Sequence, residues 1–477
     1  MADTVNPWLP LAEDDTIWPA ANKAQREEWL RVFAAGAVAI PHTAEAESAA
    51  LRQRTLAGRN YLVPHRHLPW LDFLLRKEPG SRGATQDEAL EILRQGQHLL
   101  LTGGPGTGKS HTISAFVRDL KPINARPPRV AIAAPTGKAA ARFKHLESST
   151  HALVESSTLH RLLGISRDER RLTYNALHPL PCDILIIDEI SMLDLFLFSA
   201  TLRALPPGAQ LLLAGDLEQL PAVDGLPIDE AIRFISERQI MSHVHLTQVQ
   251  RFSAEKAHAY RLLAAKGFAA LEEPAVAGVI DRVRISNANA LQVYTDAYAE
   301  EYLNGKDARM LREAFARIQE TSDLTAALAE QAFGFLRARV LLCERREGVF
   351  GALAISRRIA TAALRFSQGI GRTLEPVMNT FNDYDLQIYN GDVGFLWETQ
   401  GRRRVVFQTP EGGFRIVEAD RLRGAETAYA MTIHKSQGSE YEDVFIINES
   451  GAAADARLLY TAVTRARNKA TILEVVK

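Results

Sequence analysis

The sequence predicts an α/β fold built from two nucleotide-binding domains in tandem. Short apolar segments alternate with helical patterns in two successive series, and an apolar run enters a glycine-rich loop early in the first series. Strands that alternate with helices predict parallel sheets covered on both faces, with ligands at the carboxyl ends of the strands. The chain has 477 residues, 46% of them hydrophobic, which suffices for about two to four domains with cores of their own.

The two series of strands set the expected order of the domains. The first series lies at residues 99–101, 130–134, 184–187 and 211–214, and the second lies at residues 340–343, 443–447 and 471–475. Residues 257–332, rich in Ala, Leu and Glu, are expected to be mainly helical. Residues 372–423 carry glycines between strand-like runs such as GFLWET and RRRVVFQT, which predicts a small antiparallel β-barrel inserted in the second domain.

The N-terminal region has a different character. Apolar positions at residues 25–40 recur at helical spacing, further helix is expected around residues 51–62, and the Pro-Gly stretch at 79–83 separates this region from the rest. We therefore expect a small helical domain, a first nucleotide-binding domain and a second one interrupted by the insertion, at residues 1–80, 81–250 and 251–477.

Composition narrows the function classes. The formal net charge is −1, so nucleic-acid binding has to use a local basic surface rather than the field of the whole protein. The two cysteines, Cys182 and Cys343, lack metal-ligand spacing, which argues against a zinc site or disulfide framework and suits a reducing cytoplasm. No apolar run approaches the ~18–20 residues that span a membrane, and the acidic N-terminus lacks a signal-peptide pattern. We expect a cytoplasmic protein without a membrane partner.

Residues 103–110, GGPGTGKS, match the phosphate-binding pattern G-x-x-x-x-G-K-[ST]. The glycines let successive backbone N–H groups turn toward phosphate oxygens, and the helix expected to start near Lys109 adds its positive end. Lys109 is expected to reach the β- and γ-phosphates, and the Ser110 hydroxyl to bind Mg²⁺. The loop therefore predicts a nucleoside triphosphate site, with ATP and Mg²⁺ as cofactors.

A second motif, ILIIDEIS at residues 184–191, ends an apolar strand in two acids. Asp188 is expected beside the Mg²⁺ held by Ser110, and Glu189 within reach of the attacking water. Apolar residues followed by two acids also occur by chance, but the position of this pair downstream of the phosphate-binding loop favours the catalytic interpretation.

Four further side chains complete the expected triphosphate site. Gln219 follows the strand at 211–214 and can sense the γ-phosphate, although a glutamine after a strand is more often a surface residue. Gln86 can offer a donor and an acceptor to an adenine edge, or lie on the surface of a helix. Arg251 and Arg465 are expected to come from the second domain and stabilise charge on the transferring phosphate, with a structural ion pair as the alternative for either.

The signals for nucleic-acid binding are local. Residues 126–171 carry nine Lys and Arg against four Asp and Glu, a basic patch on a neutral chain. Polar and basic side chains suited to backbone phosphates occur in the segments APTGKAAARF and TIHKSQGSEYEDV, namely Thr136, Lys138, Arg142, His434 and Lys435. A histidine such as His434 is usually packed in a core, but the polar run around it favours a role facing a ligand.

Eight segments taken together resemble the motifs of superfamily 1 helicases. In chain order they are GGPGTGKS, AAPTGKAAAR, STLHRLLG, IIDEISMLD, LAGDLEQLPAV, NGDVG, AMTIHKSQGSEY and YTAVTRAR. The sequence most resembles the RecD family, the α subunit of exodeoxyribonuclease V (RecBCD), from about Gln86 to the C-terminus. The resemblance implies a 5′→3′ DNA motor with two RecA-like domains, an SH3-like β-barrel insertion at residues 372–423 and a short β-hairpin pin at residues 165–178.

The resemblance also implies roles for individual residues. The catalytic residues would be Lys109, Asp188, Glu189, Gln219, Arg251 and Arg465. The metal would be held by Ser110 and Asp188. Nucleotide contacts would come from Gln86, Gly103, Gly104, Pro105, Gly106, Thr107, Gly108, Lys109, Ser110 and His111. The DNA strand would be contacted by Thr136, Lys138, His160, His434 and Lys435.

The implied partners are single-stranded DNA, duplex DNA ends, and RecB- and RecC-like subunits of a complex for double-strand break repair by recombination. The sequence has no metal-carboxylate nuclease constellation, so exonuclease activity would belong to a partner. The N-terminal region is short for the family and matches it poorly. Two alternatives stay open: a stand-alone 5′→3′ helicase, and a non-motor subunit that uses ATP as a conformational switch. The pair Asp188–Glu189 and the presence of Arg465 argue against the second.

Overall fold

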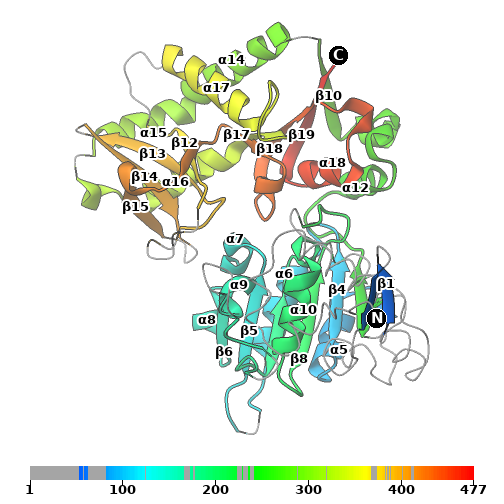
Figure 1. The fold of residues 1–477 in the computed structure, drawn as a ribbon. Coiled ribbons are helices and arrows are strands. Elements are labelled where there is room, and N and C mark those ends of the chain that lie inside the picture. Colours follow the sequence, from blue (N-terminus) through cyan, green and yellow to red (C-terminus); the bar gives the residue numbers. More distant parts are fainter. Residues whose placement is uncertain are drawn as a thin grey trace. The chain divides into compact units, whose positions relative to one another are not determined.

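The computed structural model describes residues 82–476 with short gaps, together with strands β1 (Gln53–Leu56) and β2 (Arg59–Leu62). The gaps are residues 124, 166–171, 176–177, 223–227, 229–231, 233–234, 237–240, 287, 319, 367–372, 382, 384–385, 387, 400 and 410–412. The chain divides into two compact units, Met1–Arg251 and Phe252–Lys477 (Figure 1). Among the described helices, none is long and apolar enough to cross a membrane.

Unit 1 is built on a seven-stranded sheet in the order β3-β9-β4-β8-β7-β5-β6, in which every neighbouring pair is parallel. The strands are β3 (Arg82–Gly83), β4 (Leu99–Gly103), β5 (Arg129–Ala134), β6 (Leu153–Thr158), β7 (Ile184–Ile187), β8 (Gln210–Gly215) and β9 (Ser242–Leu246). The four strands predicted from apolar runs are confirmed. The other three strands were not predicted, because β3 has only two residues and the runs of β6 and β9, LVESST and SHVHL, are half polar.

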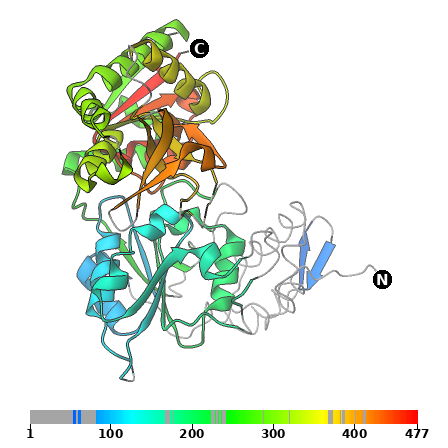
Figure 2. The ribbon, with the colours of Figure 1, turned by 90° about the vertical axis from the view of Figure 1, so that its left-hand side faces the viewer.

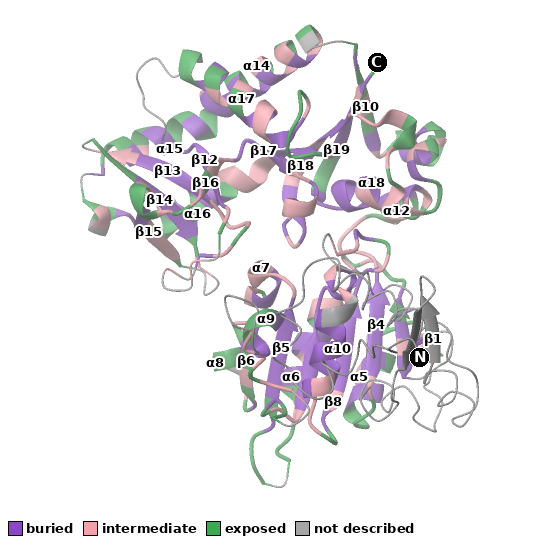
Figure 3. Cartoon of the chain, viewed as in Figure 1, coloured by how far each residue is buried: buried purple, intermediate pink, exposed green. Residues whose placement is uncertain are grey.

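Helices cover both faces of this sheet (Figure 2). They are α5 (Gln86–Arg94), α6 (Lys109–Asp119), α7 (Gly137–Ala141), α8 (Leu146–Ser149), α9 (Leu159–Leu162), α10 (Leu195–Ala204) and the 3-10 turn η3 (Ile190–Met192). Within β4, Leu99 and Leu101 pack in a core with α5 and α6, whereas Leu100 packs in the opposite core with α9 and α10. Successive side chains of a strand point to opposite faces, so a strand buried on both faces is apolar throughout. Figure 3 shows the buried strands of this sheet.

Unit 2 contains a five-stranded parallel sheet in the order β10-β19-β18-β11-β17. Its strands are β10 (Ile280–Ile285), β11 (Arg339–Cys343), β17 (Ala430–Thr432), β18 (Tyr441–Asn448) and β19 (Ala466–Val475). The three predicted strands of the second series are confirmed, and so are the parallel sheets of the α/β fold. The helical expectation for residues 257–332 is wrong at β10, whose sequence IDRVRI buries only its two end residues and becomes a strand by pairing with β19.

The helical elements of unit 2 alternate with these strands along the chain. They are α12 (Ala254–Lys266), η4 (Gly267–Glu272), α13 (Pro274–Ala277), α14 (Ala288–Asn304), α15 (Lys306–Ala316), η5 (Thr321–Asp323), α16 (Ala326–Ala338), α17 (Ala352–Phe366), η6 (Ala419–Arg421), η7 (His434–Ser436), η8 (Gly451–Ala453) and α18 (Ala456–Val463). Helices α14 and α17 pack with β11 and β18 in one core, which includes Leu291, Ile355 and Leu341.

The insertion forms a separate antiparallel sheet in the order β15-β14-β13-β12-β16. Its strands are β12 (Pro376–Asn379), β13 (Val393–Thr399), β14 (Arg402–Gln408), β15 (Phe414–Glu418) and β16 (Ala425–Thr427). Phe395 and Trp397 of β13 pack against Phe315 of α15 and Phe333 of α16. The antiparallel pairing agrees with the prediction, but β16 lies beyond residue 423. No pairing between the described strands joins β15 to β16 to close a barrel.

Two expectations fall mainly outside the described residues. Helix was expected around residues 51–62, but β1 and β2 pair antiparallel there, from Gln53↔Leu62 to Leu56↔Arg59. That prediction is wrong because two short runs separated by two residues that include a glycine favour a hairpin over a helix. The rest of residues 1–80 lies outside the residues that the structure describes. The same holds for most of the predicted pin, of which Asn175 and His178 exchange backbone hydrogen bonds of 2.9 and 3.1 Å.

Candidate active site

The predicted site residues of unit 1 all follow strands of one parallel sheet. Carboxyl ends of parallel strands meet at the same edge, so the sheet order sets the order of the residues along that edge. From β3 to β6 this order is Gln86, Arg251, the phosphate-binding loop, Gln219, the pair Asp188–Glu189, the pair Thr136–Lys138, and His160. The residues expected to bind nucleotide therefore occupy one stretch of the edge, and those expected to contact DNA occupy the next.

The phosphate-binding loop joins β4 to α6. Helix α6 begins at Lys109, and its N-cap is Gly108 in the left-handed conformation, with φ of 95°. The Lys109 ammonium donates to the carbonyl oxygens of Gly103 and Gly104 at 2.5 and 3.0 Å. The Thr107 hydroxyl donates to the Gly104 carbonyl at 2.8 Å. These bonds hold the loop and its lysine in one compact arrangement at the start of the helix.

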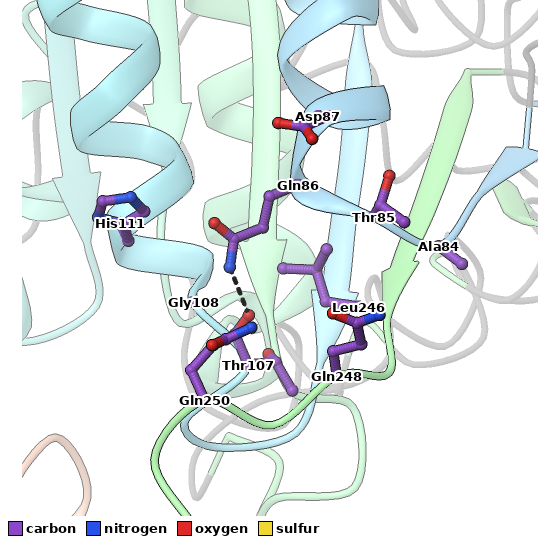
Figure 4. A pocket seen from close by; sticks show the side chains of 10 residues that line it. All are labelled: Ala84, Thr85, Gln86, Asp87, Thr107, Gly108, His111, Leu246, Gln248 and Gln250. Atoms are coloured by element: carbon purple, nitrogen blue, oxygen red, sulfur yellow. Dashed lines mark hydrogen bonds between the residues drawn. The ribbon is translucent and has the colours of Figure 1, made fainter.

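Gln86 connects α5 to this loop. It is the first residue of α5, directly after Thr85, which forms a capping box with Glu88. The Gln86 amide donates through Nε2 to the Thr107 carbonyl at 3.1 Å (Figure 4). A Cβ on Gly108 would lie 2.1 Å from Gln86 Nε2, so a glycine is required both for this approach and for the positive φ.

A cavity of about 640 Å³ lies beside Gln86. Its lining residues are Ala84, Thr85, Gln86, Asp87, Thr107, Gly108, His111, Leu246, Gln248 and Gln250 (Figure 4). The volume is within the range of small-molecule sites, and the lining combines amide groups with an apolar side chain. The cavity opens next to the start of α6, where the helix dipole and backbone N–H groups favour an anion.

Asp188 and Glu189 follow β7, and Arg142 contacts both. The side chain of Asp188 is 2% exposed, and the Arg142 Nη1 atom lies 3.4 Å from its Oδ2 atom and 3.3 Å from Ser110 Oγ. Arg142 Nη2 lies 3.6 Å from Glu189 Oε1. Burial and the charge of Glu189 raise the pKa of Asp188 to about 6, against the opposing effect of Arg142 and Lys109. Its sequence context grouped Arg142 with the nucleic-acid signals, whereas these contacts place it beside Asp188 and Glu189.

The backbone of Glu189 is strained. Its φ is 57° and its ψ 45°, the left-handed conformation, which costs a non-glycine residue about 1–2 kcal/mol. Such strain collects at functional sites, where it aims a side chain that regular structure would turn away.

The side-chain oxygens of Ser110 and Asp188 are suitable ligands for a magnesium ion. Ser110 Oγ and Asp188 Oδ2 lie 3.3 and 3.4 Å from the same nitrogen of Arg142, so a hydroxyl and a carboxylate oxygen are both close to one guanidinium nitrogen. Mg²⁺ prefers oxygen ligands and is usually held by one or two carboxylates together with phosphates and water. The described residues contain no cluster of three or more His, Cys, Asp or Glu that could hold a metal ion.

Gln219 is buried, which excludes the surface alternative. Its side chain donates through Nε2 to Asp216 Oδ2 at 2.9 Å, and the Gln219 residue is 6% exposed. Strand β8, which precedes it, lies between β4 and β7 in the sheet. Gln219 therefore follows the strand between the phosphate-binding loop and Asp188.

The two predicted arginines lie in different units. Arg251 was expected from the second domain, but it is the last residue of unit 1, and its Cβ lies against Gly106. The chain returns there because β9 pairs with β4 and the Gln250 N–H donates to the Gly106 carbonyl at 2.8 Å. Arg465 belongs to unit 2 and is 5% exposed. Its guanidinium donates to the Thr461 and Ser439 carbonyls at 3.1 and 3.4 Å and to the Thr464 hydroxyl at 3.2 Å.

The residues predicted on the DNA side also divide between the units. In unit 1, Thr136 caps α7 by accepting from the Ala139 N–H at 3.2 Å, Lys138 lies in α7, and His160 is exposed on α9. In unit 2, His434 and Lys435 lie in η7 after β17. Burial lowers the pKa of both side chains, and the Lys435 ammonium donates to the side-chain oxygen of Asn390.

A polar network that the sequence analysis missed lies behind the phosphate-binding loop. Thr102, directly before Gly103, has its hydroxyl 2.7 Å from His243 Nε2 and 2.9 Å from His245 Nδ1. The Ser236 hydroxyl lies 2.8 Å from His243 Nδ1. Burial, together with His245 and Arg82, lowers the pKa of His243 to about 4. The network therefore holds a neutral His243 against the strand that delivers the loop.

Comparisons with known proteins agree with the motifs. Two family models match the chain, an AAA domain at residues 86–224 and a UvrD-like helicase C-terminal domain at residues 427–473. The RecBCD enzyme subunit RecD of Mycobacterium tuberculosis (strain CDC 1551 / Oshkosh) is 32% identical over 420 residues, covering 81% of this chain and 68% of that protein. The chain belongs to the RecD family of DNA helicases. The resemblance predicted from the sequence is confirmed.

Other relatives of this RecD-family chain include an ATP-dependent RecD2 DNA helicase of Deinococcus radiodurans. It is 31% identical over 472 residues, which cover 96% of this chain and 57% of that protein. Among solved structures, a Pif1 helicase from Bacteroides in complex with ADP-AlF3 and ssDNA is similar with a TM-score of 0.43 and 17% identity. That similarity covers 82% of this chain and 91% of the other.

Proposed function

We propose that this chain is an ATP-dependent DNA helicase that moves 5′→3′ along single-stranded DNA and unwinds duplex ends in the cytoplasm. The observation that carries the proposal is the order of residues along the sheet edge of unit 1. The phosphate-binding loop follows β4, Gln219 follows β8 and the acidic pair follows β7. The segments proposed to contact DNA follow the next two β-strands, β5 and β6. A motor requires this proximity, because ATP hydrolysis must alter the grip on DNA.

The residues of unit 1 divide the work of hydrolysis. Backbone N–H groups at residues 103–110 and the Lys109 ammonium hold the β- and γ-phosphates, and the Gln86 carbonyl oxygen accepts from the adenine edge. Glu189 orients the attacking water and accepts its proton. Ser110 and Asp188 hold Mg²⁺, which when bound neutralises charge on the phosphate oxygens.

Three further residues act on the γ-phosphate in this proposal. Gln219, held by Asp216, senses its presence, and Arg251 stabilises the charge that develops during transfer. Arg465 has the same electrostatic role, and its three hydrogen bonds within unit 2 fix its guanidinium in advance. Preorganised charge of this kind is the main source of catalysis in phosphoryl transfer.

DNA contacts are assigned to Thr136, Lys138 and His160 in unit 1 and to His434 and Lys435 in unit 2. These side chains suit phosphates rather than base edges, so we expect binding without sequence specificity and with affinity that falls as salt rises. We also propose that residues 165–178 form the strand-separating pin and that the insertion is an SH3-like barrel, while residues 1–80 form a separate N-terminal domain.

Two settings are open to this motor. As a RecD-like subunit it would assemble with RecB- and RecC-like proteins in an exodeoxyribonuclease V complex for double-strand break repair. A stand-alone helicase is the second candidate, because the relative that aligns with 96% of the chain is named as a DNA helicase, whereas the relative named as a RecBCD enzyme subunit aligns with 81%. Co-purification of the tagged chain with RecB- and RecC-like proteins supports the first setting, and a monomer that unwinds DNA alone supports the second.

The deciding experiment is strand displacement on duplexes with a 5′ or a 3′ single-stranded tail. We expect unwinding of the 5′-tailed duplex, ATP hydrolysis stimulated by single-stranded DNA, and loss of both in Lys109→Ala and Arg465→Ala. Arg118→Gln, an exposed substitution in the last turn of α6, serves as the matched control. Unwinding of only the 3′-tailed duplex would reverse the polarity, and ATP hydrolysis without any displacement would favour the non-motor switch.

A further inference from the structure

Arg142 lies where the nucleotide side and the DNA side of unit 1 meet. It is the C-cap residue of α7, a helix of five residues that begins after Thr136 at the carboxyl end of β5. Lys138 precedes it by four residues, so the two side chains share one face of the helix, about 6 Å apart along its axis. Strand β5 pairs with β7, whose carboxyl end carries Asp188. Helix α7 therefore carries a proposed contact to DNA, Lys138, and ends in Arg142, which reaches Asp188 and Glu189.

Arg142 contacts residues that the proposed function assigns to catalysis: Ser110 and Asp188 as ligands of the metal, and Glu189 as the general base. Its Nη1 atom lies 3.3 Å from Ser110 Oγ and 3.4 Å from Asp188 Oδ2, and its Nη2 atom lies 3.6 Å from Glu189 Oε1. The side chain of Arg142 is 36% exposed, whereas that of Asp188 is 2% exposed. A guanidinium offers several donors in one plane, so it can compensate two neighbouring carboxylates and a hydroxyl at once.

The buried residues of helix α7 are small, whereas Phe143, directly after Arg142, is fully buried in the core that includes α6. Within α7, Ala139 and Ala140 pack with Ala134 in a cluster of three alanines, and the Ser156 hydroxyl donates to the Ala140 carbonyl at 2.5 Å. The buried Phe143 holds the backbone at this end of the helix, whereas the Arg142 side chain is 36% exposed and can change its rotamer. A change of the Arg142 rotamer moves its guanidinium relative to Ser110 and Asp188.

We infer that Arg142 is a positioning residue that couples the binding of a DNA strand at α7 to Mg²⁺–nucleotide binding at Ser110 and Asp188. The inference rests on the proposed helicase function. A divalent cation and a guanidinium repel each other at the same carboxylate, so Mg²⁺–nucleotide binding requires Arg142 to withdraw. A DNA strand that favours the withdrawn position of the Arg142 side chain then favours Mg²⁺–nucleotide binding by the same factor by which the nucleotide favours DNA.

The test is the affinity of the full chain for the fluorescent nucleotide mant-ADP, measured in Mg²⁺ and in EDTA, with and without oligo(dT). For the wild type in Mg²⁺, we expect oligo(dT) to tighten binding about fivefold or more, and to have little effect in EDTA. For Arg142→Gln, binding in Mg²⁺ without DNA is expected to tighten by a similar factor, and oligo(dT) then adds little. In EDTA its affinity is expected to match the wild type, because the conflict of charges is with the metal.

Two variants control for structural effects. Arg118→Gln removes an exposed arginine from α6 and is expected to keep the wild-type affinities and coupling. Arg142→Lys retains the positive charge and is expected to retain part of the coupling, and it carries the test if Arg142→Gln does not fold. The inference is overturned if Arg142→Gln changes the affinity equally in Mg²⁺ and EDTA, or if its coupling to oligo(dT) equals that of the wild type.

The results that would overturn the proposed helicase function differ from those that would overturn the role of Arg142. A wild type that neither unwinds DNA nor hydrolyses ATP faster with single-stranded DNA removes the helicase proposal. The Mg²⁺-dependent change of mant-ADP affinity in Arg142→Gln without DNA is then still measurable, and its absence would overturn the role of Arg142 at the metal site independently.

Discussion

Replacing Gly106 by alanine isolates one packing contact at the phosphate-binding loop. Gly106 has a φ of 75°, and a Cβ added to it would lie 2.7 Å from the Cβ of Arg251. The neighbouring Gln250 N–H donates to the Gly106 carbonyl at 2.8 Å, so the two backbone segments are tied together. The clash is with the root of a side chain and not with its flexible end, and the Arg251 segment has to move.

A matched control exists within the same unit. Gly96 has the same φ of 75°, but a Cβ added there meets nothing within 4 Å. Both alanines incur the left-handed strain of about 1–2 kcal/mol and the same gain from a less flexible unfolded chain. Gly106→Ala adds the overpacking cost of about 1–3 kcal/mol. The difference between the two variants is therefore the cost of the contact with Arg251.

Thermal unfolding and nucleotide binding measure this difference. For a unit of this size, about 1–3 kcal/mol corresponds to a Tm lower by about 2–12 °C for Gly106→Ala than for Gly96→Ala. We also expect weaker mant-ATP binding by Gly106→Ala, because the displaced segment distorts the loop, and unchanged binding by Gly96→Ala. Equal Tm values and equal affinities for the two variants would refute the argument that Arg251 packs on the loop.

Three further predictions concern other contacts of the two units. Lys256 in α12 is buried, and its ammonium donates to three consecutive carbonyls at residues 466–468, so Lys256→Met should destabilise the protein by about 2–4 kcal/mol in urea unfolding. Lys266→Met, which removes an exposed ion pair, should cost about 1 kcal/mol or less, and equal losses would contradict the role of the buried contacts. The pKa of His243 is lowered from 6.5 to about 4, so the unfolded chain binds more protons between these values. Stability is therefore full above pH 6.5 and falls toward pH 4, by about 1–2 kcal/mol after allowance for partial exposure, and His243→Asn should remove that part of the pH slope. Gln86→Ala loses the bond to the Thr107 carbonyl, so mant-ATP binding should weaken about fivefold and discrimination of ATP from GTP should fall; unchanged nucleotide preference would refute its contact with the base.

Much of the fold followed from local patterns. The seven predicted strands are mainly apolar and mainly buried, because a strand in the middle of a parallel sheet alternates its side chains between two cores. The weaker strands β6, β9 and β10 were missed because pairing with neighbours, rather than their own hydrophobicity, makes them strands. The hairpin of β1 and β2 was mistaken for helix although the glycine between its two short runs is itself a local signal for a turn.

By itself, the sequence determined the chemistry of the nucleotide site. A glycine-rich loop ending in Lys109 and Ser110 and a strand ending in Asp188 and Glu189 are each complete within a few residues, since backbone conformation and local spacing define them. The family resemblance likewise depended on short segments in a fixed order.

Only the tertiary structure decided which of these segments meet. Arg142 contacts Asp188, 46 positions away, because β5 lies beside β7, and Arg251 lies against Gly106 because β9 returns beside β4. Hydrogen bonds between β-strands form across any separation along the chain. The hydrophobic pattern of a single strand therefore does not predict which strands lie beside it in the sheet. The order of the strands placed Arg142, which the sequence grouped with the nucleic-acid signals, beside Ser110, Asp188 and Glu189.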